Sequence, residues 1–108
     1  LADDAAQSLR ENRIVTARPP TTIADGLRTA LGDKTFPIIR EFVDSIALAE
    51  EGEIRHALRL ILERMKIVVE PSAAVPLAVL LNRPLGLRGA RVGIILSGGN
   101  VDVSHLPV

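Results

Sequence analysis

The chain has no cysteine, tryptophan or tyrosine, and only two of its 108 residues are phenylalanine. Without cysteine there is no disulfide framework and no thiolate metal site. So few aromatic side chains argue against a stacking platform for nucleobases or sugars. The 13 basic and 13 acidic residues balance, so no net charge attracts a nucleic acid or an anionic membrane surface. We therefore expect neither a nucleic acid nor a membrane as a partner.

Long hydrophobic runs are also missing. No apolar stretch reaches the ~18 residues of a membrane span, and no signal-peptide pattern opens the chain. Together with the lack of cysteine, this indicates a cytoplasmic protein. The hydrophobic fraction is 47%, which is enough for the core of one small domain. Because the first residue is Leu1 rather than methionine, and a glycine motif lies just before Val108, we expect a piece of a longer protein or a processed one.

Apolar spacing and capping residues predict helices along most of the chain. We expect them over about residues 4–12, 22–31, 36–43, 50–66 and 72–81. Asp3 or Asp4 caps the first helix, and Thr35 caps the third. The fourth is the strongest, since a stripe of apolar side chains from Ile54 to Met65 forms a core-facing surface. The last is apolar almost all round and is expected to be buried.

Short apolar segments between the helices predict strands. Residues 45–49 and 91–96 are expected to be strands, residues 67–69 extended, and residues 82–89 a surface loop. The pair Pro19-Pro20 favours a polyproline-like turn. Helices alternating with strands predict an α/β fold with a mainly parallel sheet. Since two or three strands do not make a stable open sheet, the other strands must come from sequence outside this chain or from a partner.

The segment that follows the last predicted strand is the most informative about function. It reads Ser97-Gly98-Gly99-Asn100-Val101-Asp102. A small hydroxyl side chain followed by two glycines lets the backbone approach a flat ligand closely. Open α/β folds bind their ligands at such strand ends. Taken alone, the motif also fits a simple turn that closes a strand.

Other polar residues carry less information. The sequence has no Ser-His-Asp set, Walker loop or dinucleotide fingerprint. The adjacent acids Asp3 and Asp4 fit either a helix cap or a hard-cation site. Glu70 precedes Pro71 at a helix start, where its charge suits the helix dipole. The isolated lysines are interpreted as solvated charges, and no histidine has a second one at metal-ligand spacing. These four residues are Lys34, Lys66, His56 and His105.

Six segments become specific when they are taken together. They are residues 2–4 (ADD), 19–26 (PPTTIADG), 36–40 (FPIIR), 63–66 (ERMK), 70–74 (EPSAA) and 97–102 (SGGNVD). In order and nearly in spacing, the set resembles the serine/threonine dehydratase and serine racemase family of pyridoxal-phosphate enzymes. The resemblance implies a fold-type II, tryptophan synthase β-like architecture. Residues 1–108 would be the C-terminal part of its cofactor-binding catalytic region, an incomplete domain.

The resemblance also implies roles for individual residues. Ser97 would donate its hydroxyl to the pyridine nitrogen of pyridoxal 5'-phosphate. Because a neutral hydroxyl does not protonate the ring as an aspartate would, the ring would be a weaker electron sink, which suits loss of an α-proton and then of a β-hydroxyl. The other implied cofactor-binding residues are Gly26 flanking the ring, Gly98 and Gly99 leaving room beside it, Asn100, and Glu70 on the cofactor-facing wall.

A divalent-cation site is implied at the start of the chain. Ala2, through its carbonyl, and Asp4, through its carboxylate, match two of the family's ligands, which suit Mg²⁺ or Ca²⁺. The family's third ligand is a glutamate shortly upstream, which this chain lacks. Two further departures are Thr21, where the family has an acidic residue, and Ala49, where it has a Ser or Thr helix cap worth ~1 kcal/mol.

The implied activity belongs to a longer parent. The Schiff-base lysine, the phosphate loop and the racemases' serine acid/base lie upstream in the family, so no catalytic residue is expected in this chain. The parent would be a homodimeric dehydratase that converts L-threonine or L-serine to a 2-oxo acid and ammonia, or a serine racemase. A hydroxyaspartate dehydratase is the alternative within the family. A non-catalytic remnant or an interaction module is the alternative from another class.

Overall fold

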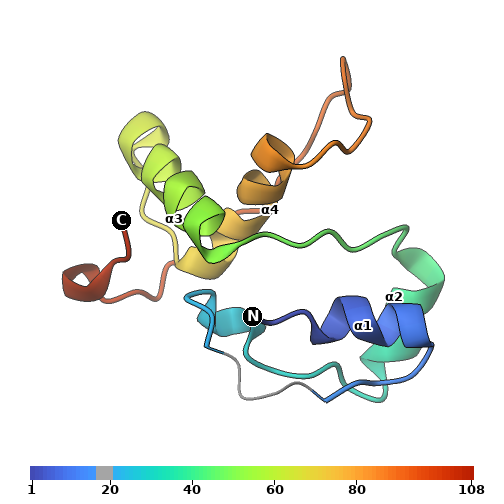
Figure 1. The fold of residues 1–108 in the computed structure, drawn as a ribbon. Helices are drawn as coiled ribbons and strands as arrows, with labels where there is room; N and C mark the ends of the chain where they lie inside the picture. The colour runs from blue at the N-terminus through green and yellow to red at the C-terminus, as the bar shows by residue number, and fades with distance from the viewer. Residues whose placement is uncertain (17–20) are drawn as a thin grey trace. The chain divides into compact units, whose positions relative to one another are not determined.

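The computed structural model describes residues 1–16 and 21–108 (Figure 1). The predicted turn at Pro19-Pro20 lies outside the described residues. The chain divides into two compact units, one of residues 1–22 and 26–48 and the other of residues 23–25 and 49–108. The α-helices are α1 (Asp4–Glu11), α2 (Thr35–Phe42), α3 (Glu51–Leu60) and α4 (Pro71–Asn82). A π-helical turn, η2 (Ile61–Met65), continues α3, and two short 3-10 helices are η1 (Asp25–Leu27) and η3 (Val103–His105).

Helix α1 confirms the predicted position but not the predicted cap. Asp3 is at the N-cap position, yet its carboxylate accepts a hydrogen bond from the Gln7 side chain (2.8 Å) and none from the helix backbone. This hydrogen bond lowers the pKa of Asp3. Asn12 ends the helix in the left-handed conformation (φ 54°), which asparagine tolerates. The buried Ser8 hydroxyl donates to the Asp4 carbonyl (2.7 Å) and accepts from the Val15 amide (2.9 Å), so the following chain folds back over the helix.

Helix α2 also forms where the sequence predicts it, one residue earlier than expected. Thr35 is the first helical residue rather than the cap, and its hydroxyl donates to the Gly32 carbonyl (3.2 Å). Phe36 is buried, and the Arg40 guanidinium lies 5.7 Å from the centre of its ring. Arg40 also donates to the Asn12 side chain (2.8 Å), which ties α2 to the end of α1.

The helix predicted over residues 22–31 is wrong, because only the three residues of η1 are helical there. Gly26 lies in the middle of this segment, and a glycine inside a helix costs about 1 kcal/mol relative to alanine. The Arg28 guanidinium donates two hydrogen bonds to the Thr22 carbonyl, at 2.9 and 2.7 Å. The Thr22 carbonyl therefore bonds to a side chain and not to a backbone amide further along, as it would in a helix. These bonds hold the segment in a turn.

The core of the second unit lies between α3 and α4, which contact each other (Figure 1). Small side chains on α4 let the two helices approach closely, and larger ones from α3 fill the space between them. The buried core comprises Ala24, Ile54, Ala57, Leu58, Ile61, Val69, Ala73, Ala74 and Ala78. The predicted apolar stripe is buried as far as Ile61, whereas Leu62 is only half-buried and Met65 is 55% exposed. A π-helical turn has more residues than an α-helical one, so η2 shifts Met65 out of the stripe.

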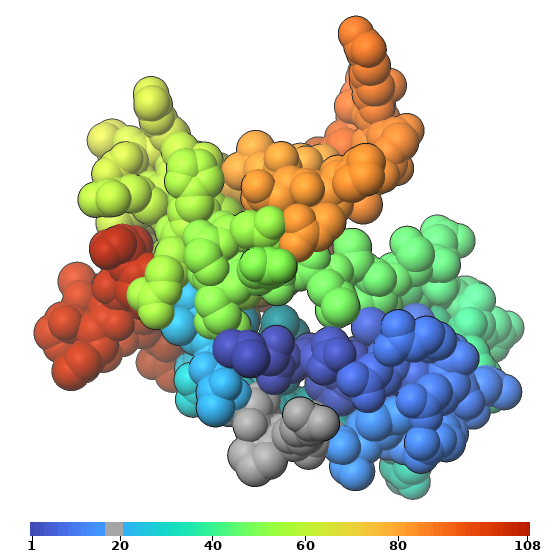
Figure 2. Space-filling model, viewed as in Figure 1, coloured from blue at the N-terminus to red at the C-terminus, as the bar shows by residue number. Residues whose placement is uncertain are grey.

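Helix α4 runs from Pro71 to Asn82, one residue longer at each end than predicted, and it is not buried all round. Pro76 and Leu81 are exposed although both are apolar, because packing against α3 covers one face of the helix. The loop that follows has positive φ at Gly86 (67°) and Gly89 (76°), which favours glycine. Figure 2 shows this loop (orange) projecting from the second unit.

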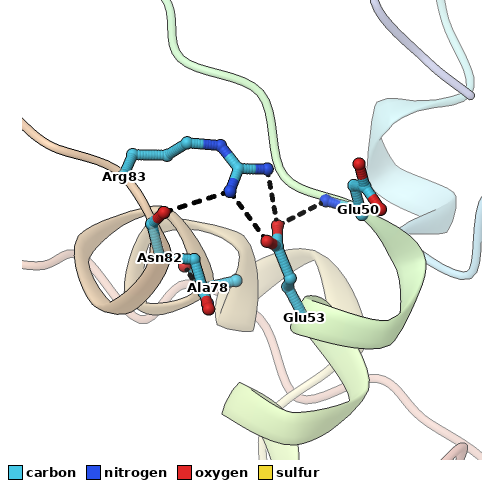
Figure 3. Close-up of polar contacts among 5 residues, drawn as sticks. All are labelled: Glu50, Glu53, Ala78, Asn82 and Arg83. Carbon is cyan, nitrogen blue, oxygen red and sulfur yellow. Dashed lines mark hydrogen bonds and ion pairs between the residues drawn. The ribbon is translucent and has the colours of Figure 1, made fainter.

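An ion pair joins the beginning of α3 to the end of α4 (Figure 3). The Glu53 carboxylate accepts hydrogen bonds from both terminal nitrogens of Arg83, at 2.7 and 2.8 Å. It also accepts from the backbone amide of Glu50 (2.8 Å), the N-cap residue, which is half of a capping box. The helix is therefore capped at Glu50, and the cap loss predicted at Ala49 is wrong. The Arg83 and Glu53 side chains are 29% and 21% exposed, so the pair is largely shielded from water.

We expect this ion pair to make stability depend on pH in the acid range. Hydrogen bonds from Arg83 and from the Glu50 amide lower the pKa of Glu53 below its usual 4.5. Its contribution to the free energy of unfolding is therefore complete above pH 4.5 and is lost as the pH falls through the lowered pKa. Replacing Glu53 with glutamine should flatten that part of the profile, measured by urea unfolding from pH 6 to 2. The control is Glu41→Gln on the exposed side of α2; identical profiles for both variants would contradict the expectation.

The described residues contain no β-strand, so the strands predicted over residues 45–49 and 91–96 are not formed here. Both segments lie outside helices, as does the extended segment 67–69, but a strand requires a neighbour that shares its backbone hydrogen bonds. The predicted α/β class is thus corrected for this chain, whose regular structure is all helical within the described residues. In that same part of the chain, no helix is both long and apolar enough to cross a membrane.

Candidate functional site

The candidate site lies in the second unit, where two non-helical segments end side by side. Glu70 follows residues 67–69, and Ser97 follows the apolar residues 92–96. The backbone amide of Glu70 donates a hydrogen bond to the Gly98 carbonyl (3.2 Å). The structure thus brings together Glu70 and the glycine motif, which are separated by 26 residues in the sequence.

Gly98 is required by a close contact with Glu70, whereas Gly99 makes only an ordinary contact with the chain before Glu70. Gly98 has a φ of 82°, and a Cβ atom there would lie only 2.5–2.7 Å from the three carboxyl atoms of Glu70. A Cβ atom on Gly99 would lie 3.4 Å from the Val68 carbonyl oxygen. In this structure, the space that Gly98 leaves is filled by Glu70. Any larger residue at position 98 would have to displace that carboxylate or change the backbone.

Glu70 is fixed from both sides along the chain. Its neighbours Val69 and Pro71 are buried, and its carbonyl accepts the Ala73 amide (3.0 Å) at the start of α4. Its side chain gives no capping hydrogen bond to that helix and is half-buried. Ser97 and Asn100 are exposed. The site therefore combines a carboxylate, carried by a backbone that is held between buried residues, with an accessible hydroxyl and an accessible amide.

A polar turn follows the motif, and sequence reasoning missed it. The Asp102 carboxylate accepts from the Ser104 amide (2.9 Å) and hydroxyl (2.6 Å) and lies 2.7 Å from His105 Nδ1. These contacts lower the pKa of Asp102. Since Ser104 and Asp102 both face Nδ1, the three residues do not form a catalytic triad, in which serine and aspartate face different ring nitrogens. The Asp-x-Ser-His spacing is the signal that could have predicted this turn.

The remaining predicted site residues belong to the first unit. Asp4 is buried at the beginning of α1, Ala2 is half-buried and Gly26 is exposed within η1. Across residues 1–16 and 21–108, no group of three or more His, Asp or Glu side chains could hold a metal ion. The cation site at Ala2 and Asp4, with Mg²⁺ or Ca²⁺, stays a prediction, as does the role of Gly26.

Comparison with known proteins decides the family. The family model for pyridoxal-phosphate dependent enzymes matches residues 1–98. The chain belongs to this family. It is 48% identical to a serine racemase of Dictyostelium discoideum over 109 aligned positions. The alignment covers 97% of this chain and 34% of that racemase. It is 44% identical to a β-hydroxyaspartate dehydratase of Paracoccus denitrificans, covering 98% of this chain and 34% of that protein.

Solved structures of fold-type II enzymes also match this chain. A threonine deaminase from T.th. is 48% identical and superposes with a TM-score of 0.86, covering 94% of this chain and 34% of that one. The chain thus spans about a third of the length of the relatives it matches. The predicted fold-type II architecture is confirmed as a structural match, although the described residues form no strand of their own.

Proposed function

We propose that this chain forms part of the cofactor-binding region of an enzyme that eliminates water from a hydroxy amino acid, giving a 2-oxo acid and ammonia, or that racemises serine. The observation that carries the proposal is the pairing of Glu70 with the Ser97-Gly98 turn, where an exposed hydroxyl follows an apolar segment. Similarity to a serine racemase and to a threonine deaminase supports it. The parent would act on a small amino acid as a homodimer, with the rest of the enzyme supplying the catalytic lysine.

The residues present fit pyridoxal phosphate. The Ser97 hydroxyl is accessible and uncharged, as a hydrogen-bond donor to a neutral ring nitrogen must be. When bound, the cofactor supplies the electron sink for the carbanion left by α-proton removal. Ser97 would hold the pyridine nitrogen with a neutral hydrogen bond and so leave that ring uncharged. Asn100 offers an amide within the same segment.

A second candidate is favoured by the similarity to a β-hydroxyaspartate dehydratase. This substrate has a second carboxylate, and its reaction is the same elimination of water. Ser97 would have the same role for both substrates, because it acts on the cofactor. The difference between the two substrates must therefore arise from residues that bind the substrate's side chain.

The test is a substrate panel with the purified full-length parent. We expect visible cofactor absorbance and formation of a 2-oxo acid from L-threonine, L-serine or β-hydroxyaspartate, or formation of D-serine from L-serine. The preferred substrate decides between the two candidates. A full-length protein without cofactor absorbance and without turnover would reject the proposal in favour of a non-catalytic module.

A further inference from the structure

We propose that Glu70 is a positioning residue whose carboxyl group packs flat against Gly98 and fixes the peptide from which the Ser97 hydroxyl is presented. The inference rests on the proposed function for what Ser97 binds. The contact between Glu70 and Gly98 is independent of it. The role is one of shape: the side chain at position 70 fills the space beside a glycine, and its charge is not required for that.

The geometry of the contact carries the inference. From the Cβ position of Gly98, the Glu70 Cδ, Oε2 and Oε1 atoms lie 2.5, 2.6 and 2.7 Å away. Three nearly equal distances mean that the carboxyl plane faces this position and does not meet it with one oxygen alone. The hydrogen bond from the Glu70 amide to the Gly98 carbonyl (3.2 Å) holds the same two residues together through the backbone. Side chain and backbone of Glu70 therefore both act on Gly98.

Because Gly98 has a positive φ, its contact with Glu70 affects the backbone conformation of the neighbouring residue Ser97. A φ of 82° is a backbone conformation that only glycine adopts readily. Outside this contact, glycine also adopts many other conformations at little cost. The exposed segment around Ser97 thus needs a second group to select one of them. Glu70, mounted between the buried residues Val69 and Pro71, is that group.

The first experiment compares Glu70→Gln and Glu70→Ala in the full-length holoenzyme. Glutamine has the same shape, so we expect kcat, cofactor fluorescence and cofactor affinity within about twofold of the wild type. Alanine leaves a gap beside Gly98, so kcat should fall roughly tenfold, with KM little changed and the cofactor emission shifted. A glutamine variant as impaired as the alanine variant would mean that charge carries the role, and would overturn the proposal.

The second experiment is a double-mutant cycle between positions 70 and 98. Gly98→Ala should weaken cofactor binding by roughly a hundredfold, because the new methyl group collides with Glu70 at a strained φ. Adding Glu70→Ala removes the collision and should restore binding about tenfold. The control is Gly89→Ala in the exposed loop after α4, where φ is also positive (76°) but a Cβ atom meets nothing within 4 Å, and we expect a change below twofold. Additive effects at positions 70 and 98 would overturn the proposal.

The four proteins of the cycle are the wild type, Glu70→Ala, Gly98→Ala and the double variant. They also distinguish a failure of this inference from a failure of the proposed function. If the wild type binds no cofactor, the proposed function fails, and the cycle is then measured by urea unfolding of the same full-length proteins. The non-additivity between Glu70→Ala and Gly98→Ala should persist there, since it comes from their direct contact. If Gly98→Ala does not fold, the inference is tested by the first experiment alone, which compares Glu70→Gln with Glu70→Ala.

Discussion

Replacing Ser97 with alanine in the full-length parent is expected to lower kcat by roughly tenfold, the upper end of the usual effect of losing a hydrogen bond between neutral groups. Ser97 is exposed at the turn that Glu70 holds, and alanine keeps its backbone while removing its hydroxyl. The visible absorbance of the cofactor should persist, because its covalent attachment depends on a lysine elsewhere. Steady-state kinetics and an absorbance spectrum of the same sample measure both effects.

Ser104→Ala is the matched control for this experiment. Ser104 is an exposed serine seven residues further along, and its hydroxyl is bound to Asp102 rather than available to a ligand. We expect its kcat to stay within about twofold of the wild type. Equal losses in the two variants, or unchanged turnover of Ser97→Ala, would contradict the role assigned to Ser97.

Leu58→Ala is expected to cost about 2–5 kcal/mol of the free energy of unfolding, the usual range for a buried leucine. Leu58 is 1% exposed and lies on α3 within the core shared with α4. The alanines of α4 are too small to fill the resulting cavity, which places the cost in the upper part of that range. Urea unfolding of the full-length protein measures it.

His56→Ala on the exposed side of α3 is the control for Leu58. A surface substitution of this kind changes stability by about 0.5 kcal/mol or less. If Leu58→Ala cost no more than His56→Ala, the α3–α4 interface would not be part of the stable core. The comparison therefore tests the packing of the second unit directly.

The sequence predicts an element of this fold well when the element depends only on neighbouring residues, and poorly when it needs a partner from elsewhere. Helices α1, α3 and α4 follow from apolar spacing and terminal residues, and Pro71 indicates the beginning of α4 correctly. The strand predicted at residues 91–96 does not form, because no other described segment shares its backbone hydrogen bonds. The prediction that Met65 faces the core is wrong, because a π-helical turn leaves no signal in the spacing of apolar residues.

The candidate site shows the same division. The motif at residues 97–100 is visible in the sequence, but the contact between Glu70 and Gly98 is not, since no local rule joins residues so far apart. One signal points to it. Each follows an apolar segment, and the carboxyl ends of neighbouring parallel strands meet at one edge of a sheet. The partner of His105 could have been predicted from its spacing of three residues from Asp102.

The segment at residues 92–96, which pairs with no strand within the described residues, has a practical consequence for anyone who produces this chain by itself. Its sequence, Val-Gly-Ile-Ile-Leu, has no charge and no proline, and Ile95 is 81% exposed. An apolar segment whose backbone is not part of a sheet is a template for intermolecular β-pairing. At high concentration the isolated chain should therefore form aggregates that bind amyloid dyes, and a lysine at position 95 would act as a gatekeeper against them.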